Sequence, residues 1–284
     1  MDMFSQLRAW IVRVDRERVQ SFAQYLWTRF LDDRCFETAG ALAYTTLFAL
    51  VPLSMVVFGI LSAFPIFNEW SADLTNFIFS NFVPSSARVV EGYLRGYAAS
   101  ASKLTVTGVG ALLVSLLLTM WSIESTFNRV WRVPTPRPRL MRFLVYWTLL
   151  TLGTLLAVAS LAVTSYLFSL PVLSGVEQLD WSQRLLGFLP NLVELAVFSF
   201  AYWLIPHRSV RFRYALAGGL FATVLFELSK RAFAAYLLGV PTYDQVYGTL
   251  AVAPIFLIWI YLSWTVVLLG ASFSASLSSF RYQP

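Results

Sequence analysis

The sequence predicts an all-α integral membrane protein with six transmembrane helices. Hydrophobic residues make up 58% of the 284 residues and charged residues only 13%, a balance far from that of soluble globular proteins. Six apolar runs are each close to or above the roughly 20 residues that cross a bilayer. Lys and Arg residues also gather between alternate runs, as membrane topology requires.

Residues 1–37 are expected to form a cytoplasmic amphipathic segment. Phe4, Leu7, Ile11 and Val14 recur at steps of three or four, with arginines between them. This spacing predicts an amphipathic helix that lies on an anionic membrane surface with its basic side toward water. A solvated helix packed against the inner end of the bundle fits the same pattern.

The transmembrane domain is predicted over residues 38–277. Its first span, about 38–64, is followed by residues 65–103, where apolar residues recur at helical spacing on both sides of Pro84. We expect a periplasmic insertion of short amphipathic helices there, either in the outer interface or dipping back into the bundle. The other predicted spans are about 104–123, 143–170, 185–205, 214–238 and 250–277, followed by a cytoplasmic tail at 278–284.

The distribution of basic residues predicts the orientation. With a cytoplasmic N-terminus, fifteen of the 21 Lys and Arg residues lie inside and only four lie outside: Arg88, Arg95, Lys103 and Arg184. Cytoplasmic loops carry such an excess, so both termini are predicted to be cytoplasmic. The net charge of +6 is therefore interpreted as orientation, and we expect no nucleic-acid partner.

The fifth span contains the charges that we single out for function. Glu227 precedes Lys230 by three residues and Arg231 by four, so the three side chains can share one helix face. An ionisable group at bilayer depth is costly and should find a partner inside the bundle or a wet cavity. Glu194 in the fourth span lies at a similar depth, roughly 10 to 16 Å from the outer end. We predict that Glu194 or Glu227 pairs with Lys230 or Arg231.

These residues head the list of candidate sites. The polar turn after the fifth span adds two tyrosines, and the ends of other spans add three secondary candidates. A structural ion pair that locks helices together fits the charged residues equally well. The candidates for substrate binding or ion relay are Glu194, Glu227, Lys230, Arg231, Tyr243 and Tyr247, and the secondary candidates are Glu124, Asn128 and Tyr44.

The composition argues against an enzyme. The chain has one cysteine, Cys35, and one histidine, His207, so one chain cannot assemble a Cys/His metal cluster. A metal-dependent nuclease needs several converging His or carboxylate ligands, and neither a Gly-x-Ser-x-Gly elbow nor a Walker A loop is present. We expect no catalytic residue, no bound metal and no cofactor.

Several short motifs resemble the YihY/BrkB family of bacterial inner-membrane proteins from about residue 36 onward. Each motif is short, and their order and spacing together carry the resemblance. The motifs are Ala43-Tyr44, Leu50-Val51-Pro52-Leu53, Trp121 to Asn128 with Trp131, Tyr202 with Pro206, Gly218, Glu227-Leu228-Ser229-Lys230 with Phe233 and Tyr236, Tyr243 with Tyr247-Gly248, and Trp259-Ile260-Tyr261 with Leu269-Gly270-Ala271.

The resemblance implies six transmembrane helices in a bacterial inner membrane. The family is linked to envelope function and virulence, and it has been proposed to be a transporter family. Some members formerly carried the label ribonuclease BN, which the lack of converging metal ligands argues against.

Two functions fit the sequence. The first is a transporter or flippase for an envelope molecule, such as an anionic amphiphile or a lipid. Lys230 and Arg231 would attract its anionic group, and Glu194 and Glu227 would be their partners or proton carriers. The second is a non-transporting structural or assembly protein of the envelope whose buried ion pairs lock helix packing. Membrane lipids are the expected partners in both cases.

Small residues occur in pairs that allow close helix contacts. Gly218 is four residues before Ala222, and Gly270 is four residues before Ser274. Such pairs let helix backbones approach closely, either within one chain or between two copies. A homo-oligomer is therefore compatible with the sequence.

The topology can be tested with reporter fusions. A fusion at Gln283 should report the cytoplasm and a fusion in the 171–184 loop the periplasm, because the excess of basic residues retains its loops inside. Enzymatic reporters active on only one side of the membrane measure this. Two fusions on the same side would contradict the six-span topology.

Overall fold

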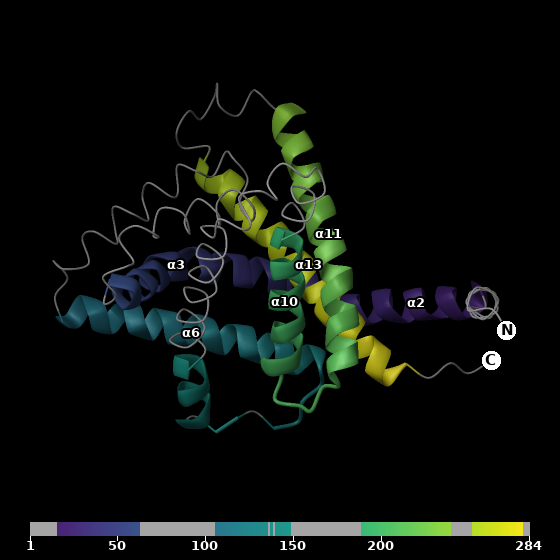
Figure 1. The fold of residues 1–284 in the computed structure, drawn as a ribbon, viewed down its shortest axis with the longest axis horizontal. Coiled ribbons are helices and arrows are strands. Elements are labelled where there is room, and N and C mark those ends of the chain that lie inside the picture. Colours follow the sequence, from purple (N-terminus) through teal and green to yellow (C-terminus); the bar gives the residue numbers. More distant parts are fainter. Residues whose placement is uncertain are drawn as a thin grey trace, which may run out of the picture.

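The computed structural model describes residues 16–62, 106–135, 137–138, 140–148, 189–239 and 252–280. The predicted insertion at 65–103, most of the third span, Tyr243 and Tyr247 lie outside these residues. Within the described part, the regular structure is helical throughout (Figure 1). The helices are α2 (Arg16–Asp32), α3 (Cys35–Ser62), α6 (Val106–Val130), α10 (Leu189–Leu204), α11 (Phe212–Gly239) and α13 (Val252–Ser279), with a further helical segment at 140–148.

Two described helices are long and apolar enough to cross a membrane. They cover Phe212–Leu237 and Ala253–Ser279, and Cys35–Leu50 forms a shorter apolar helix. The two long helices correspond to the predicted fifth and sixth spans. The all-helical class is confirmed for the described residues, while the count of six spans stays a prediction.

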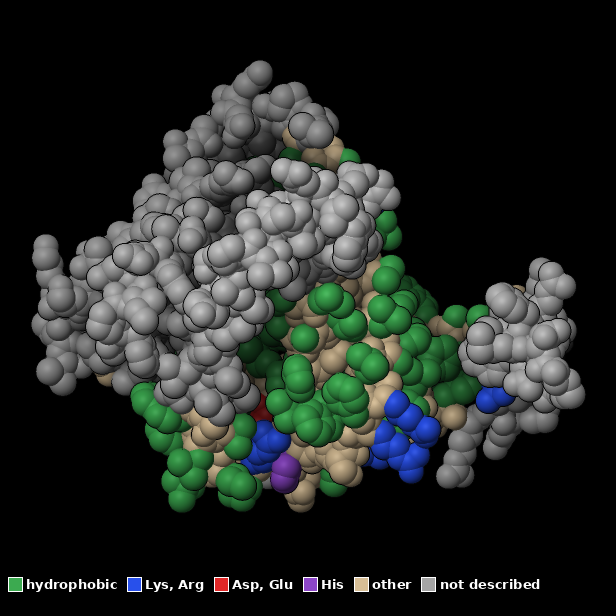
Figure 2. Space-filling model, viewed as in Figure 1, with side chains coloured by type: hydrophobic (Ala, Val, Ile, Leu, Met, Phe, Trp, Pro, Cys, Tyr) green, Lys and Arg blue, Asp and Glu red, His purple; other side chains and the backbone are tan. Residues whose placement is uncertain are grey.

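The outward face of α11 is apolar at every fourth position. Leu216, Leu220, Val224 and Leu228 are between 42% and 60% exposed, and hydrophobic side chains cover much of the face seen in Figure 2. Water-soluble monomers rarely expose an apolar patch of this kind. This apolar face of α11 is suited to contact with lipid, which agrees with the prediction of a membrane protein.

Helix α13 is the centre of the described bundle. It contacts α2, α3, α6, α10 and α11, and in Figure 1 it crosses the neighbouring pair α10 and α11 obliquely. Its C-terminal half is rich in small residues, and Ala271, Ser272, Ser274, Ala275 and Ser276 are all buried. Small side chains allow backbones to approach closely, so one helix can contact five others.

Helices α11 and α13 approach each other closely. A Cβ atom on Gly218 would lie 2.6 Å from the Cβ of Ser274, and one on Gly270 would lie 2.7 Å from the Cβ of Ala222. Real Cβ atoms do not come this close to other heavy atoms. The small-residue pairs predicted from the sequence therefore make contacts within one chain.

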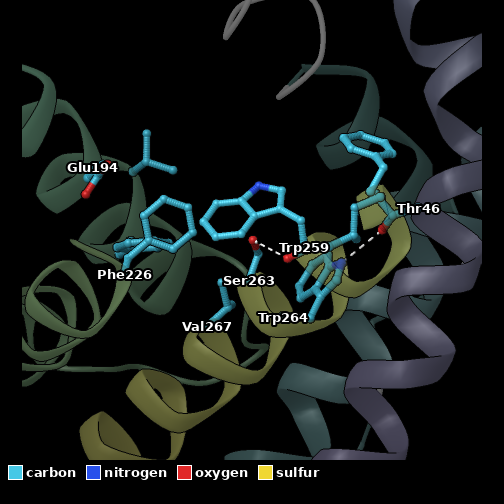
Figure 3. A pocket seen from close by; sticks show the side chains of 11 residues that line it. Thr46, Glu194, Phe226, Trp259, Ser263, Trp264 and Val267 are labelled. Atoms are coloured by element: carbon cyan, nitrogen blue, oxygen red, sulfur yellow. Dashed lines mark hydrogen bonds between the residues drawn. The ribbon is translucent and has the colours of Figure 1, made fainter. Parts of the chain in front are cut away.

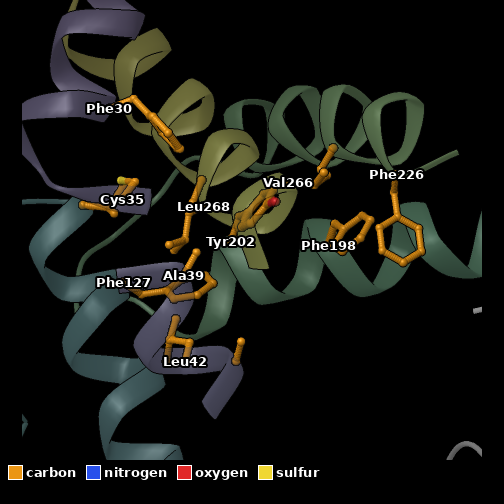
Figure 4. Close-up of a cluster of buried hydrophobic side chains, with 14 of the residues drawn as sticks. Phe30, Cys35, Ala39, Leu42, Phe127, Phe198, Tyr202, Phe226, Val266 and Leu268 are labelled. Carbon is orange, nitrogen blue, oxygen red and sulfur yellow. The ribbon is translucent and has the colours of Figure 1, made fainter. Parts of the chain in front are cut away.

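Aromatic rings form a continuous series through the core (Figure 4). Trp131 packs on Tyr202 with centroids 6.2 Å apart, Tyr202 stacks on Phe198 at 6.4 Å, and Phe198 meets Phe226 edge to face at 5.7 Å. Tyr202 is fully buried, and its hydroxyl donates to the Val267 carbonyl at 2.9 Å. The series connects α6, α10 and α11.

The C-terminus of α6 is closed by a Schellman motif, which directs Trp131 into this core. Arg132 adopts a left-handed conformation with φ 51°. Its N–H donates to the Arg129 carbonyl, and the Val133 N–H donates to the Asn128 carbonyl. Glycine usually occupies this position. An arginine in the left-handed conformation therefore carries a small conformational cost.

A buried arginine holds α2 against the bundle. Arg29 is only 5% exposed and donates to the Val130 carbonyl and to Ser279 Oγ, each at 2.7 Å. Burial raises the pKa of the neighbouring Asp33 carboxyl above its ordinary value, although the positive charge of Arg29 acts in the opposite direction. Residues 16–32 thus pack on the bundle, one of the two arrangements expected for this segment, while 1–15 lie outside the described residues.

The crossing of α11 and α13 can be tested with matched alanine variants. Gly218→Ala should lower the thermal unfolding midpoint in detergent, because the new methyl group would overlap Ser274 and overpacking typically costs about 1–3 kcal/mol. Gly110→Ala is the control, since no atom of the described residues lies within 4 Å of its added Cβ. Equal midpoints for both variants would show that the crossing is looser than described.

Candidate functional site

Four charged residues form a cluster between α10 and α11. Lys230 Nζ lies 2.7 Å from Glu194 Oε1 on α10 and 2.8 Å from Glu227 Oε2 on its own helix. Arg231 Nε lies 3.2 Å from Glu227 Oε1. The pairing of Glu194 with Lys230 that the sequence predicts is therefore confirmed, together with both pairs along α11.

The cluster lies within the apolar length of α11. Lys230 is seven residues before the end of the Phe212–Leu237 segment, which corresponds to about 10 Å along the helix axis. Its side chain extends over the Phe226 ring, with Nζ 5.6 Å from the centroid, because helical side chains lean toward the N-terminus of their helix. This direction brings the ammonium group to Glu194.

The four side chains differ in burial. The Glu194 side chain is 1% exposed, those of Lys230 and Glu227 are 20% and 29% exposed, and that of Arg231 is 76% exposed. Lys230 thus connects a buried carboxylate with a half-buried one. The cluster contains two positive and two negative charges and is neutral as a whole.

A cavity of about 310 Å³ lies beside this cluster. It is bordered by residues of α3, α10, α11 and α13, and Figure 3 shows Glu194 at one end and Thr46 at the other. Its size falls at the lower end of the range for ligand pockets. The lining residues are Thr46, Glu194, Val197, Phe198, Phe226, Phe256, Trp259, Ile260, Ser263, Trp264 and Val267.

Glu194 is the charged member of this lining. Its Oε1 accepts from Lys230, whereas its Oε2 is buried and has no hydrogen-bond partner among the described residues. Neither Lys230 nor Arg231 is among the described residues that line the cavity. Lys230 is expected from the sequence to attract an anionic group, but its ammonium group is turned toward its two carboxylates.

A second buried charge cluster lies near the C-terminal end of α6. Glu124 is 1% exposed, and its Oε2 lies 3.0 Å from Arg142 Nε. The Tyr146 hydroxyl donates to the same oxygen. Both partners belong to the helical segment at 140–148, so this cluster fixes that segment to α6. Glu124, a secondary candidate from the sequence, has a packing role in this arrangement.

Asn128, one turn further along α6, fixes the chain that enters α11. Its side-chain Oδ1 accepts from the backbone N–H of His207 at 2.8 Å. Arg208 donates to the Trp131 carbonyl at 3.0 Å, and Arg137 donates to the Leu204 carbonyl at 3.1 Å. The two basic loops therefore meet at one end of the bundle, where Figure 2 shows Lys and Arg side chains beside the single histidine.

The remaining candidates are placed as follows. Tyr44 is 59% exposed and borders a groove between α3 and α6 together with Phe48 and Ser115, so it does not join the Glu194 cluster. Tyr243 and Tyr247 lie outside the described residues. Within the part of the chain that the structure describes, no group of three His, Cys, Asp or Glu side chains could hold a metal ion.

Comparison with known proteins decides the family. The family model for "Virulence factor BrkB" matches residues 26–284. The chain belongs to the BrkB family. The resemblance stated from the sequence motifs is thereby confirmed.

The BrkB relatives are membrane proteins by name. A UPF0761 membrane protein of Stenotrophomonas maltophilia strain K279a is 52% identical, and one of Xanthomonas campestris pv. campestris strain B100 is 50% identical. In both cases the match covers all of this chain and 67% of the relative. No solved structure matches the chain. These findings support a location in a bacterial membrane.

The Glu194–Lys230 pair can be tested by breaking and replacing it. Lys230→Ala should lower the free energy of unfolding by about 3 kcal/mol, because the buried Glu194 carboxylate would lose its cation. Adding Glu194→Gln to this variant should restore part of the loss, since the uncompensated charge is removed. Thermal and denaturant unfolding in detergent measure both effects.

Arg231→Ala is the control for this pair. The Arg231 side chain is largely exposed, so its loss should cost less than about 1 kcal/mol. A larger effect for Arg231→Ala than for Lys230→Ala would contradict the assigned order.

Proposed function

We propose that the chain is an inner-membrane transporter or flippase for an amphiphilic, envelope-related molecule. The observation that carries this proposal is the cavity with the buried Glu194 carboxylate in its wall. An ion pair that only locks two helices does not need a cavity beside it. A substrate pathway needs both a space and a polar group at bilayer depth.

The two parts of an amphiphile match two parts of the site. The apolar lining, which includes Phe256, Trp259 and Ile260, suits a hydrocarbon portion. The charged cluster suits a polar headgroup. A polar group buried in an apolar surrounding is costly unless it finds a partner, and the charged side chains of the cluster would supply such partners. An anionic portion of the headgroup would lie toward Arg231, whose side chain has the greatest exposed fraction in the cluster.

A non-transporting structural role is the alternative, and specific contacts favour it. Lys230 connects α10 with α11, Arg142 connects the 140–148 segment with α6, and Arg29 connects α2 with α6 and α13. Each charge thus joins separate elements. The transport proposal differs from this alternative in requiring the cavity to be open.

The proposal can be tested by filling the cavity without changing any charge. The full chain is reconstituted into liposomes that contain a phospholipid with a fluorescent label, and a membrane-impermeant quencher then reports the label that reaches the outer leaflet. Protein should increase the quenchable fraction above that of empty liposomes. Ser263→Phe should reduce this gain by about tenfold or more, because Ser263 lines the cavity and a misplaced group in a binding site commonly costs that much.

Leu220→Phe is the matched control, since Leu220 lies on the exposed face of α11. It should leave transport at the level of the unmodified chain. A folded Ser263→Phe variant with unchanged transport would rule out this cavity as the route. Absence of transport by the unmodified chain with anionic, zwitterionic and neutral labelled lipids would favour the structural role.

A further inference from the structure

We propose that the cavity beside Glu194 binds a substituted ammonium group, that is, an alkylammonium cation with at least one N–H and with apolar substituents. The site deepens the proposed function by giving the charge of the group recognised, and its place in transport rests on that function. Three features carry the inference: the aromatic wall, the open acceptor of Glu194 and the neutrality of the charged cluster.

Five of the eleven described residues that line the cavity are aromatic. Phe198, Phe226, Phe256, Trp259 and Trp264 line it. The face of an aromatic ring attracts a cation, most strongly for tryptophan, and rings grouped around a small space are the usual means of holding alkylated ammonium groups. The wall is therefore suited to a cation with apolar substituents.

Two donors in the cavity wall are already used within the protein. The Trp264 Nε1–H donates to Thr46 Oγ1 at 3.0 Å, and the Ser263 hydroxyl donates to the Trp259 carbonyl at 2.9 Å (Figure 3). Neither of the cluster cations is among the described lining residues. An anion would therefore meet a carboxylate in this wall without a compensating donor from these groups.

The acceptor that could hold a cation is open. Glu194 is 1% exposed, and its Oε2 is buried without a hydrogen-bond partner in the part of the chain that the structure describes. A buried acceptor without a partner is destabilising until a donor reaches it. An ammonium N–H supplies that donor together with a positive charge, and such charge-assisted hydrogen bonds are the stronger kind.

The charged cluster can accommodate the added cation. Lys230 contacts Glu194 and Glu227 at nearly equal distances, 2.7 and 2.8 Å. When a ligand cation takes Glu194, Lys230 can keep Glu227 as its partner. Because the cluster is neutral before binding, the arriving cation does not meet an excess of positive charge.

Two sources could supply the ammonium group. It could belong to a free hydrophobic amine, or it could be the ammonium of a zwitterionic lipid headgroup such as ethanolamine. The recognised chemistry is the same in both cases, so binding is tested first with small probes and the source is assigned afterwards.

The test compares three probes of equal chain length on the purified full chain in detergent. Calorimetric titration is carried out with hexylammonium, hexan-1-ol and hexanoate, and protein-free micelles provide the baseline. Hexylammonium should bind saturably and at least about tenfold more tightly than hexan-1-ol, as expected for one added charge interaction. Hexanoate should bind more weakly than hexan-1-ol. Equal binding of hexylammonium and hexan-1-ol, tighter binding of hexanoate, or no saturable binding of hexylammonium would overturn the proposal.

Variants place the binding in this cavity. Glu194→Gln should lower hexylammonium affinity by about tenfold or more, and Ser263→Phe should abolish saturable binding. Glu37→Gln is the matched control, because the Glu37 side chain is 73% exposed, and it should bind as the unmodified chain does. If Glu194→Gln does not fold, Ser263→Phe and the three probes decide the question. A folded Ser263→Phe variant that still binds hexylammonium would refute the assignment.

Nanodiscs distinguish the source of the ammonium group and separate the two proposals. The discs contain a phospholipid with either an ethanolamine or a glycerol headgroup. Weaker hexylammonium binding in the ethanolamine discs assigns the site to the lipid headgroup. Equal binding in both kinds of disc assigns the site to a free amine. Ammonium binding without lipid transport would support the site and remove the transport function. Lipid transport without ammonium binding would support the function and remove this site.

Discussion

The close approach of α11 to α13 is the constraint on which the rest of the described structure depends. Gly218 and Gly270 leave no room for a Cβ atom, so the two backbones meet at Ser274 and Ala222. Helix α13 is then close enough to contact the other five helices. Since side chains on one helix face repeat every three or four residues, this contact sets which residues of α11 face inward and which face lipid.

Charges inside the apolar bundle follow from that arrangement. Lys230 lies on the side of α11 that faces α10, and the buried Glu194 meets it there. Arg29 satisfies the carbonyl at the end of α6, and Arg142 neutralises the buried Glu124. Removing one partner of a buried ion pair destabilises the protein, yet replacing both partners with well-packed apolar residues often leaves the stability unchanged. The ion pairs therefore specify which helices meet, while the apolar contacts supply most of the stability.

Much of the fold could be predicted from the sequence because its signals are local. Apolar runs gave helices α3, α10, α11 and α13 within four residues of their observed bounds, whereas α6 continues to Val130, seven residues beyond the predicted span. The Glu194–Lys230 pair was also predictable, since the rise per residue of a helix is constant and depth can be counted along two antiparallel spans. Small residues four apart predicted close contacts for the same reason.

The partners of other polar and charged residues could not be predicted, because no local pattern connects them. Asn128 meets the backbone of His207 across 79 positions, and Arg29 meets Ser279 across 250. Arg29 was counted among the basic residues of the cytoplasmic side, and its burial depends on how α2 docks. The cavity escaped prediction as well, because its lining comes from four helices that no local sequence pattern connects.

The charge that faces the cavity shows most clearly what the sequence alone leaves out. Two carboxylates and two cations can be counted along α10 and α11, and either sign could have lined a pathway. The lean of Lys230 toward the N-terminus of α11 brings its ammonium to Glu194 and Glu227, which leaves the carboxylate of α10 in the cavity wall. In the proposed site, a ligand cation binds the Oε2 atom of that carboxylate, while Lys230 contacts its Oε1 atom. Because Glu194 and Glu227 belong to different helices, the position of Lys230 links occupancy of the cavity to the contact between α10 and α11.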